Sequence, residues 1–110
     1  MIPHFEPPVC AEMIRDGGSL AMSFTSEGNR FWLLFPLIQD AAGKRLGYDS
    51  PLVINRTIGI EQPLTWKDAI SWIEQALPGL TDEHDRKWVE IMIKVATSEG
   101  GLPDDIFRET

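Results

Sequence analysis

The 110-residue chain has little cysteine and no long apolar run. Its one cysteine, Cys10, cannot form an internal disulfide, so nothing in the sequence requires an oxidising compartment. No apolar stretch approaches the ~20 residues of a membrane-spanning helix. The opening MIPHFEPPVC also lacks the basic start and continuous apolar stretch of a signal peptide. We therefore expect a cytoplasmic protein that does not enter a membrane.

Catalytic and cofactor motifs are missing as well. The sequence contains no GxxxxGK[ST] phosphate loop, no GxGxxG loop, no CxxC pair, no HExxH spacing and no GxSxG nucleophile elbow. A catalytic pair of His4 and Cys10 would need the imidazole within reach of the sulfur and a lowered thiol pKa. A lone cysteine is more commonly a small hydrophobic residue. The sequence thus predicts a protein that is not an enzyme and binds no cofactor.

His84 is the one histidine with several carboxylates around it, from Asp82, Glu83 and Asp85. Adjacent helical residues point about 100° apart, so these neighbours cannot converge on one metal ion. The residue four positions on, which shares the face of His84, is Trp88 rather than a ligand. We expect no metal site, and expect His84 to pack or to cap a helix.

Basic residues are few relative to acids. Seventeen Asp and Glu against ten Lys and Arg give a net charge of −7, of which residues 56–110 carry −5. An acidic surface repels phosphate backbones, which argues against nucleic-acid binding. The same field favours a basic protein partner, because complementary charge speeds encounter. The alternative is that the acidity serves solubility alone.

The N-terminal half combines an extended segment with strand patterns. Three prolines make residues 1–8 an extended lead-in. A short helix is expected from Val9 to Asp16, with an inner face of Cys10, Met13 and Ile14. From Ser19 the period becomes two, which is typical of a half-buried strand. Its apolar positions are Leu20, Met22 and Phe24.

A second strand is predicted over residues 30–38, which include FWLLFPLI. Such an apolar strand is either covered on both faces or covered on one and offered to a partner on the other. Pro36 marks a bulge or an unpaired edge, because proline has no N–H to donate. Residues 39–51 form either a hairpin around residues 41–44 or a longer loop.

A third strand is predicted over residues 52–60, with one apolar side made by Leu52, Ile54, Ile58 and Ile60. Strict alternation would point Arg56 into that side, where it would need a buried partner or a bound anion. Alternatively, a bulge turns Arg56 outward. The bulge is favoured because an unpaired buried guanidinium is very costly.

Two helices are predicted in the C-terminal half. Thr65 followed by Asp68 resembles a capping box, and the helix after it ends at residues 78–79. The second helix begins at Thr81 and runs to about Ser98, with acids in its first turn. Residues 102–110 are an acidic, loosely attached tail. The fold class is α+β in a single domain, residues 1–110. It has a small antiparallel sheet of about three to four strands, two C-terminal helices packed on one face and a short N-terminal helix.

These two helices carry more apolar residues than one buried face needs, which predicts a binding surface. Trp66 and Trp88 lie within their helical stripes and are assigned to the core, whereas Trp72 lies at the edge of the apolar arc. The arc of the last helix is wider than a one-sided helix needs, so the helix either is central or presents a face to a partner. The predicted partner-binding set has two anchors and four steering acids: Trp72, Ile93, Asp82, Glu83, Asp85 and Glu90.

The leading hypothesis is a non-enzymatic acidic protein that neutralises a basic partner by occlusion, as an immunity protein neutralises a toxin. The alternative is a self-associating structural or assembly subunit that uses the apolar strand of residues 31–38. A small enzyme or anion-binding domain built on Arg56, His84 or the loop of residues 39–51 ranks last.

Overall fold

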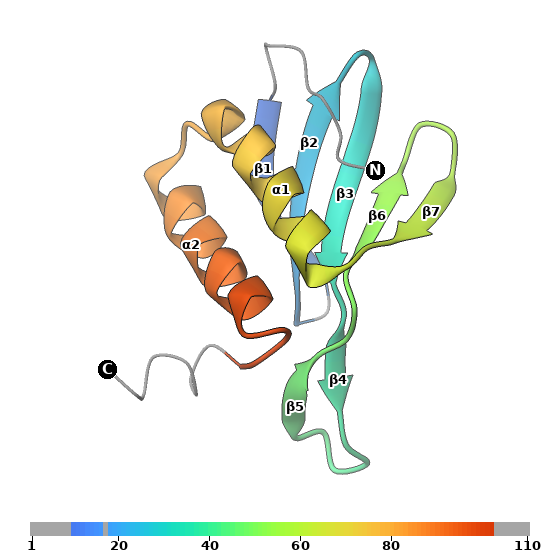
Figure 1. The fold of residues 1–110 in the computed structure, drawn as a ribbon, viewed down its shortest axis with the longest axis vertical. Helices are drawn as coiled ribbons and strands as arrows, with labels where there is room; N and C mark the ends of the chain where they lie inside the picture. The colour runs from blue at the N-terminus through green and yellow to red at the C-terminus, as the bar shows by residue number, and fades with distance from the viewer. Residues whose placement is uncertain (1–9, 17, 103–110) are drawn as a thin grey trace.

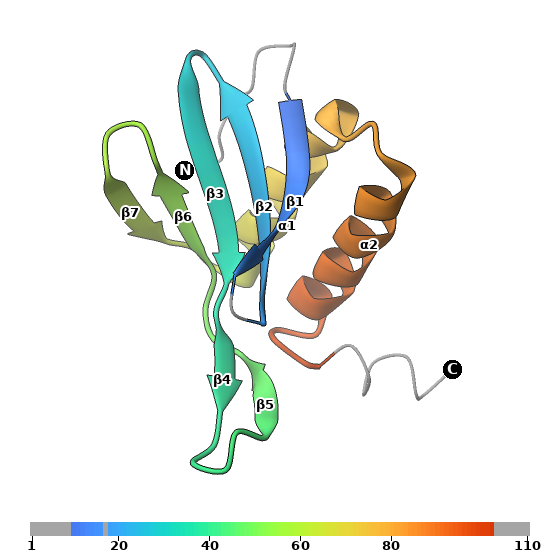
Figure 2. The same cartoon turned by 180° about the vertical axis from the view of Figure 1, so that it is seen from behind.

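A computed structural model describes residues 10–16 and 18–102. The expected lead-in, residues 1–8, and residues 103–110 of the expected tail lie outside the described residues. Leu102 is described, and it packs against the core rather than being loosely attached. Figure 1 shows an antiparallel sheet with both helices on one of its faces, and Figure 2 shows the opposite face.

Within the described residues, strands come first and helices last. The elements are β1 (Cys10–Asp16), β2 (Ser19–Ser26), β3 (Asn29–Phe35), β4 (Leu37–Gln39), β5 (Arg45–Tyr48), β6 (Leu52–Asn55), β7 (Ile60–Pro63), α1 (Trp66–Ala76), the 3-10 turn η1 (Leu77–Gly79) and α2 (Glu83–Thr97). Five strands pair in the order β1-β2-β3-β6-β7, all antiparallel, and β4 pairs with β5 separately. The α+β class and the two helices on one face are confirmed. The sheet is larger than predicted.

The predicted N-terminal helix is wrong. Its described residues form β1, which pairs with β2 from Cys10↔Thr25 to Asp16↔Ser19. A helix of eight residues is marginal in water on its own. The same segment gains a full backbone ladder when it lies beside β2. Ala11 and Met13 then share one face and pack against the core.

The strand pattern predicted for β2 is confirmed, and β3 repeats it. Leu20, Met22 and Phe24 are buried on the side of the helices. The register Met22↔Leu33 places alternate residues of β3 on the same side. Leu34 therefore lies on the face opposite the helices. Of the two alternatives for this strand, the structure shows one face packed on the helices and the other without a described element over it (Figure 2).

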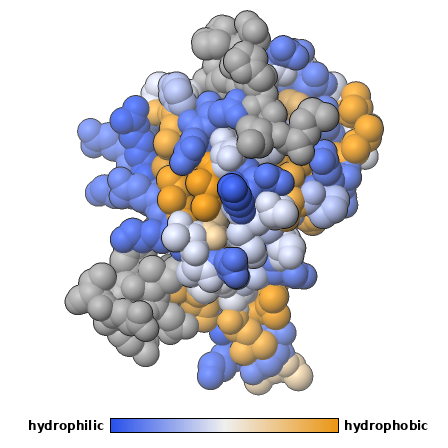
Figure 3. Space-filling model, in the orientation of Figure 1, coloured by the Kyte–Doolittle hydropathy of each residue, from blue (hydrophilic) through white to orange (hydrophobic). Residues whose placement is uncertain are grey.

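Pro36 separates β3 from the β4–β5 hairpin, which protrudes from the body as an arm (Figure 1). The hairpin alternative for this region is confirmed. The Asp40 side chain accepts hydrogen bonds from the N–H groups of Ala42 and Lys44, both at 2.9 Å, and so orders the turn. Figure 3 shows apolar surface on this arm, between α1 and α2, and over the β6–β7 hairpin.

The base of the arm is attached to the end of α2. The N–H of Tyr48 donates to the carbonyl of Gly100 at 2.8 Å. Gly100 has a φ of +101°, and a Cβ there would collide with the Tyr48 carbonyl. Only glycine meets both requirements without strain.

The single strand predicted over residues 52–60 is wrong. It is a hairpin of β6 and β7, with a turn over residues 56–59. The Asn55 side chain accepts from the N–H of Thr57 at 3.0 Å and from that of Ile58 at 3.3 Å. This is the local bonding by which asparagine favours turns. Ile58 and Ile60 are exposed instead of extending the apolar side of β6.

Both predicted helices are confirmed, with one change of cap. Thr65 Oγ1 accepts from the Asp68 N–H at 3.0 Å and begins α1. Asp82, rather than Thr81, caps α2: its Oδ1 accepts from the N–H groups of His84 and Asp85 at 2.8 and 3.2 Å. The core lies between these helices and the sheet. Its largest fully buried side chains are Phe24, Phe35, Met22, Leu33, Ile73, Leu80, Met92, Val89 and Val95.

Candidate functional site

Trp72 does not lie at the surface as predicted. It is 6% exposed, and its ring lies 5.6 Å from that of Phe24 and 5.7 Å from that of Phe31. The flanking Ala69 and Ala76 are fully buried. These small residues mark the centre of the buried arc rather than its edge. Trp72 therefore cannot anchor a partner while the core is closed.

The helical pattern of the sequence predicts a buried Trp88, but this side chain is 39% exposed. Val89, Met92 and Val95 form the inner stripe of α2, and Trp88 lies on its flank. The indole Nε1 donates to His84 Nε2 at 3.2 Å. Of the two roles expected for His84, packing or capping, this contact supports packing, here against the aromatic residue four positions on.

Two of the four predicted steering acids hold the fold together. Asp82 caps α2, and Asp85 Oδ2 accepts from the N–H of Met13 at 3.3 Å. The second bond joins the start of α2 to the outer edge of β1. A carboxylate engaged in this way has fewer lone pairs to offer a partner.

The other two predicted acids, Glu83 and Glu90, are exposed. Lys87 and Lys94 follow them at the four-residue spacing that lets opposite charges attract along a helix. Acidic and basic side chains therefore alternate along the exposed side of α2. The negative electrostatic potential there is weaker than the four predicted acids would produce without the lysines.

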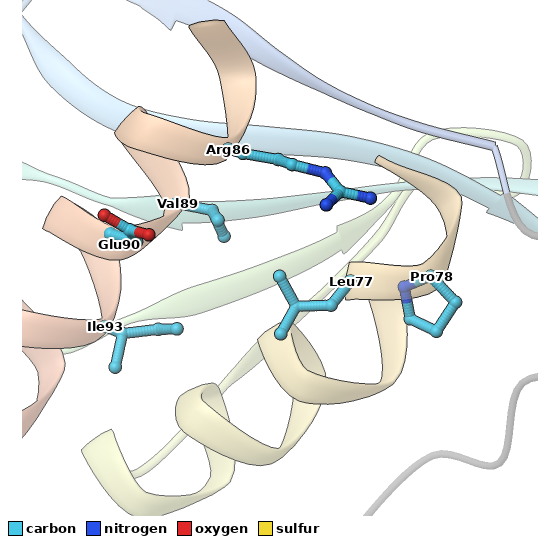
Figure 4. A pocket seen from close by; sticks show the side chains of 6 residues that line it. All are labelled: Leu77, Pro78, Arg86, Val89, Glu90 and Ile93. Carbon is cyan, nitrogen blue, oxygen red and sulfur yellow. The ribbon is translucent and has the colours of Figure 1, made fainter. Parts of the chain in front are cut away.

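Glu90 and the predicted anchor Ile93 both line a groove between α2 and η1, the 3-10 turn that follows α1 (Figure 4). The groove has a volume of about 420 Å³, and its lining residues are Leu77, Pro78, Arg86, Val89, Glu90 and Ile93. We call it the helical groove. The guanidinium of Arg86 donates from Nε to the carbonyl of Leu80 at 3.0 Å, which fixes this cation at the groove. Of the six predicted residues, the structure brings two to one concave surface, together with a cation that sequence reasoning did not include.

Charge divides unequally between the two layers. Residues 64–102, which form the helical layer, carry seven acids and four bases, a net charge of −3. Residues 10–63, which form the strands, carry six acids and five bases, a net charge of −1. The helical layer is therefore the more acidic side of the described molecule.

Arg56 points outward, but for a different reason from the one predicted. It lies in the turn after β6, not in a bulge within a strand. Its guanidinium carbon lies 4.4 Å from the centroid of the Trp32 ring. This is a cation–π contact, which holds the charge over an aromatic face on the side of the sheet away from the helices.

That side of the sheet carries two rows of side chains, which we call the open face. The register places Glu12, Ser23, Trp32, Ile54 and Glu61 in one row. The next row is Ile14, Ala21, Leu34, Leu52 and Pro63. Sequence reasoning left open whether one side of β3 is uncovered, and it did not predict that this side continues across β1, β2, β6 and β7.

The described residues show neither a metal cluster nor a candidate membrane span. Among them, no group of three or more His, Cys, Asp and Glu side chains is placed to hold a metal ion. No helix in the described ranges is long and apolar enough to cross a bilayer. Comparison with models of protein families, with curated proteins and with solved structures found no match for this chain.

Proposed function

We propose that this chain is a non-enzymatic protein-binding domain that neutralises a basic partner by covering part of its surface. The observation that carries the proposal is the helical layer. It bears a net charge of −3 and contains an open groove whose apolar wall includes Val89 and Ile93. A layer of net acidic charge with a small apolar concavity suits a partner that offers lysine or arginine beside an apolar side chain.

Binding would proceed in two stages. The field of the acidic layer raises the rate of encounter with a basic surface. An apolar side chain of the partner then enters the helical groove beside Ile93, and a partner cation pairs with Glu90 at its rim. Arg86 lies in the same groove and repels a cation placed too deeply, so it favours a partner whose charge stays at the rim.

The test compares two substitutions that make the same change of charge at different places. Glu90→Lys alters the rim of the helical groove, and Glu27→Lys alters the exposed turn between β2 and β3. Tagged wild-type chain first captures its partner from a lysate of the source organism at low salt. The association rate of the purified partner is then measured for all three chains across a salt series.

We expect Glu90→Lys to lower the association rate about tenfold at low salt and to flatten its salt dependence. Glu27→Lys should have a much smaller effect. Equal loss in both variants would mean that total charge matters and the helical groove does not. No loss in either, or a captured partner that is acidic, would refute the proposal.

A further inference from the structure

The open face is apolar where a solvated sheet is usually polar. An antiparallel sheet with one face in water normally alternates apolar and polar residues. Here the outer positions of the three central strands include Ala21, Trp32, Leu34, Leu52 and Ile54. Ala21 is fully buried beneath its neighbours, and the other four are half-buried. Figure 2 shows no described element over this face.

Among the side chains that the structure describes on the open face and at its ends, acids and bases are equal in number. Glu12 and Glu61 end one row, and Arg30 and Arg56 lie at one end of the face, so these four charges cancel. The whole chain has a net charge of −7, so two copies repel each other over most of their surfaces. The repulsion is least where the surface is apolar and the described charges balance, as they do here. We propose that a second copy of this chain docks on the open face, sheet against sheet.

One symmetric arrangement places apolar side chains of the two copies opposite each other. Consider a two-fold axis that lies between the two sheets, runs perpendicular to the strands and passes the pair Leu33 and Val53. In this dimer Trp32 lies over the second copy's Leu34. Ile54 then lies over the second copy's Leu52, and Ser23 over its Ala21. Two sheets packed in this way keep their strand directions within about 30° of each other, as aligned sheet packing requires.

Charge excludes the other simple axis. A two-fold axis parallel to the strands would place β1 over β7 of the second copy, and so Glu12 over its Glu61. It would also place Arg30 over the second copy's Arg30. With the axis across the strands, Glu12 lies over Ile14 and Glu61 over Pro63 of the second copy, so these like charges do not meet. Arg30 then lies at the opposite end of the face from the second copy's Arg30.

The size of the face predicts weak association. Five strands spaced about 4.8 Å apart make the face about 24 Å wide. About five residues along each strand, at about 3.4 Å per residue, make it about 17 Å long, so its area is roughly 400 Å². A standard interface buries about 800 Å² on each partner. We therefore expect a dissociation constant on the order of 100 μM rather than a permanent dimer. Both helical layers would face outward in this dimer, so the helical groove would remain accessible.

The test measures sedimentation over a concentration series centred on that value, with two matched variants. Leu34→Lys places a charge on the open face, and Leu46→Lys makes the same change on the arm, where Leu46 is 56% exposed. We expect wild type and Leu46→Lys to dimerise equally and Leu34→Lys to weaken the dimer at least tenfold. Thermal unfolding checks that each variant folds. Ile54→Gln replaces Leu34→Lys if the latter does not fold.

Salt separates this proposal from the proposed function. Screening reduces repulsion between identical acidic chains, so added salt should strengthen the dimer. The same salt should weaken a complex with a basic partner. A wild-type chain that stays monomeric throughout the series would overturn the proposal. So would loss of the dimer in Leu46→Lys with retention in Leu34→Lys, because the contact would then be on the arm.

Discussion

Replacing each of two tryptophans tests the packing of the helices directly. Trp72 is 6% exposed and contacts two phenylalanine rings, whereas Trp88 is 39% exposed on the flank of α2. Truncating a buried tryptophan to alanine costs about 3–5 kcal/mol in lost burial and cavity formation. Truncating a half-exposed one should cost about 1 kcal/mol or less. We therefore expect Trp72→Ala to lower the free energy of unfolding by at least about 2 kcal/mol more than Trp88→Ala.

The assay is urea unfolding of the two variants and the wild type, followed by circular dichroism. A domain of this size has a total stability of about 5–15 kcal/mol, so Trp72→Ala could leave the chain largely unfolded. Trp72→Phe keeps an aromatic ring and provides a milder step in the same direction. Equal losses for Trp72→Ala and Trp88→Ala, or a larger loss for Trp88→Ala, would refute this packing. The helices would then be rotated toward the arrangement expected from the sequence.

Two further predictions concern contacts between distant elements. Asp85→Ala removes the acceptor for the Met13 N–H at the β1 edge and should lower the free energy of unfolding by about 1–2 kcal/mol. Urea unfolding measures this loss. A change below about 0.3 kcal/mol would contradict a role for that hydrogen bond. Gly100→Ala should destabilise more than Gly43→Ala, because both glycines have positive φ but only at Gly100 would the added methyl meet backbone. Equal shifts of the unfolding temperature in Gly100→Ala and Gly43→Ala would show that the backbone at Gly100 and Tyr48 is not closely packed.

The helices were predictable because their signals are local. Thr65 bonds to an N–H three residues away, and the Pro78–Gly79 pair follows the end of α1. Neither signal needs information from the rest of the chain. The alternating pattern of β2 was equally readable, since its period depends only on the backbone of an extended strand.

The candidate site was less predictable. Glu90 and Ile93 were expected at a binding surface, and both line the helical groove. The sequence predicts Asp82 and Asp85 at this surface too. The acidic residues at the start of a helix do not show which carboxylates accept hydrogen bonds from the protein's own backbone. The bond from Asp85 to Met13 joins residues 72 positions apart, so no local pattern contains it.

The sequence by itself determined the two helices, the β2–β3 hairpin, the α+β class and the excess of acidic charge. These depend on propensities, caps and counts that act within a few residues. Only the tertiary structure decided that residues 10–16 are a strand, that Trp72 rather than Trp88 is buried, and that β3 leaves one apolar side uncovered. Each of these depends on which distant segment lies alongside, because a ladder needs a partner strand and burial needs an opposing surface.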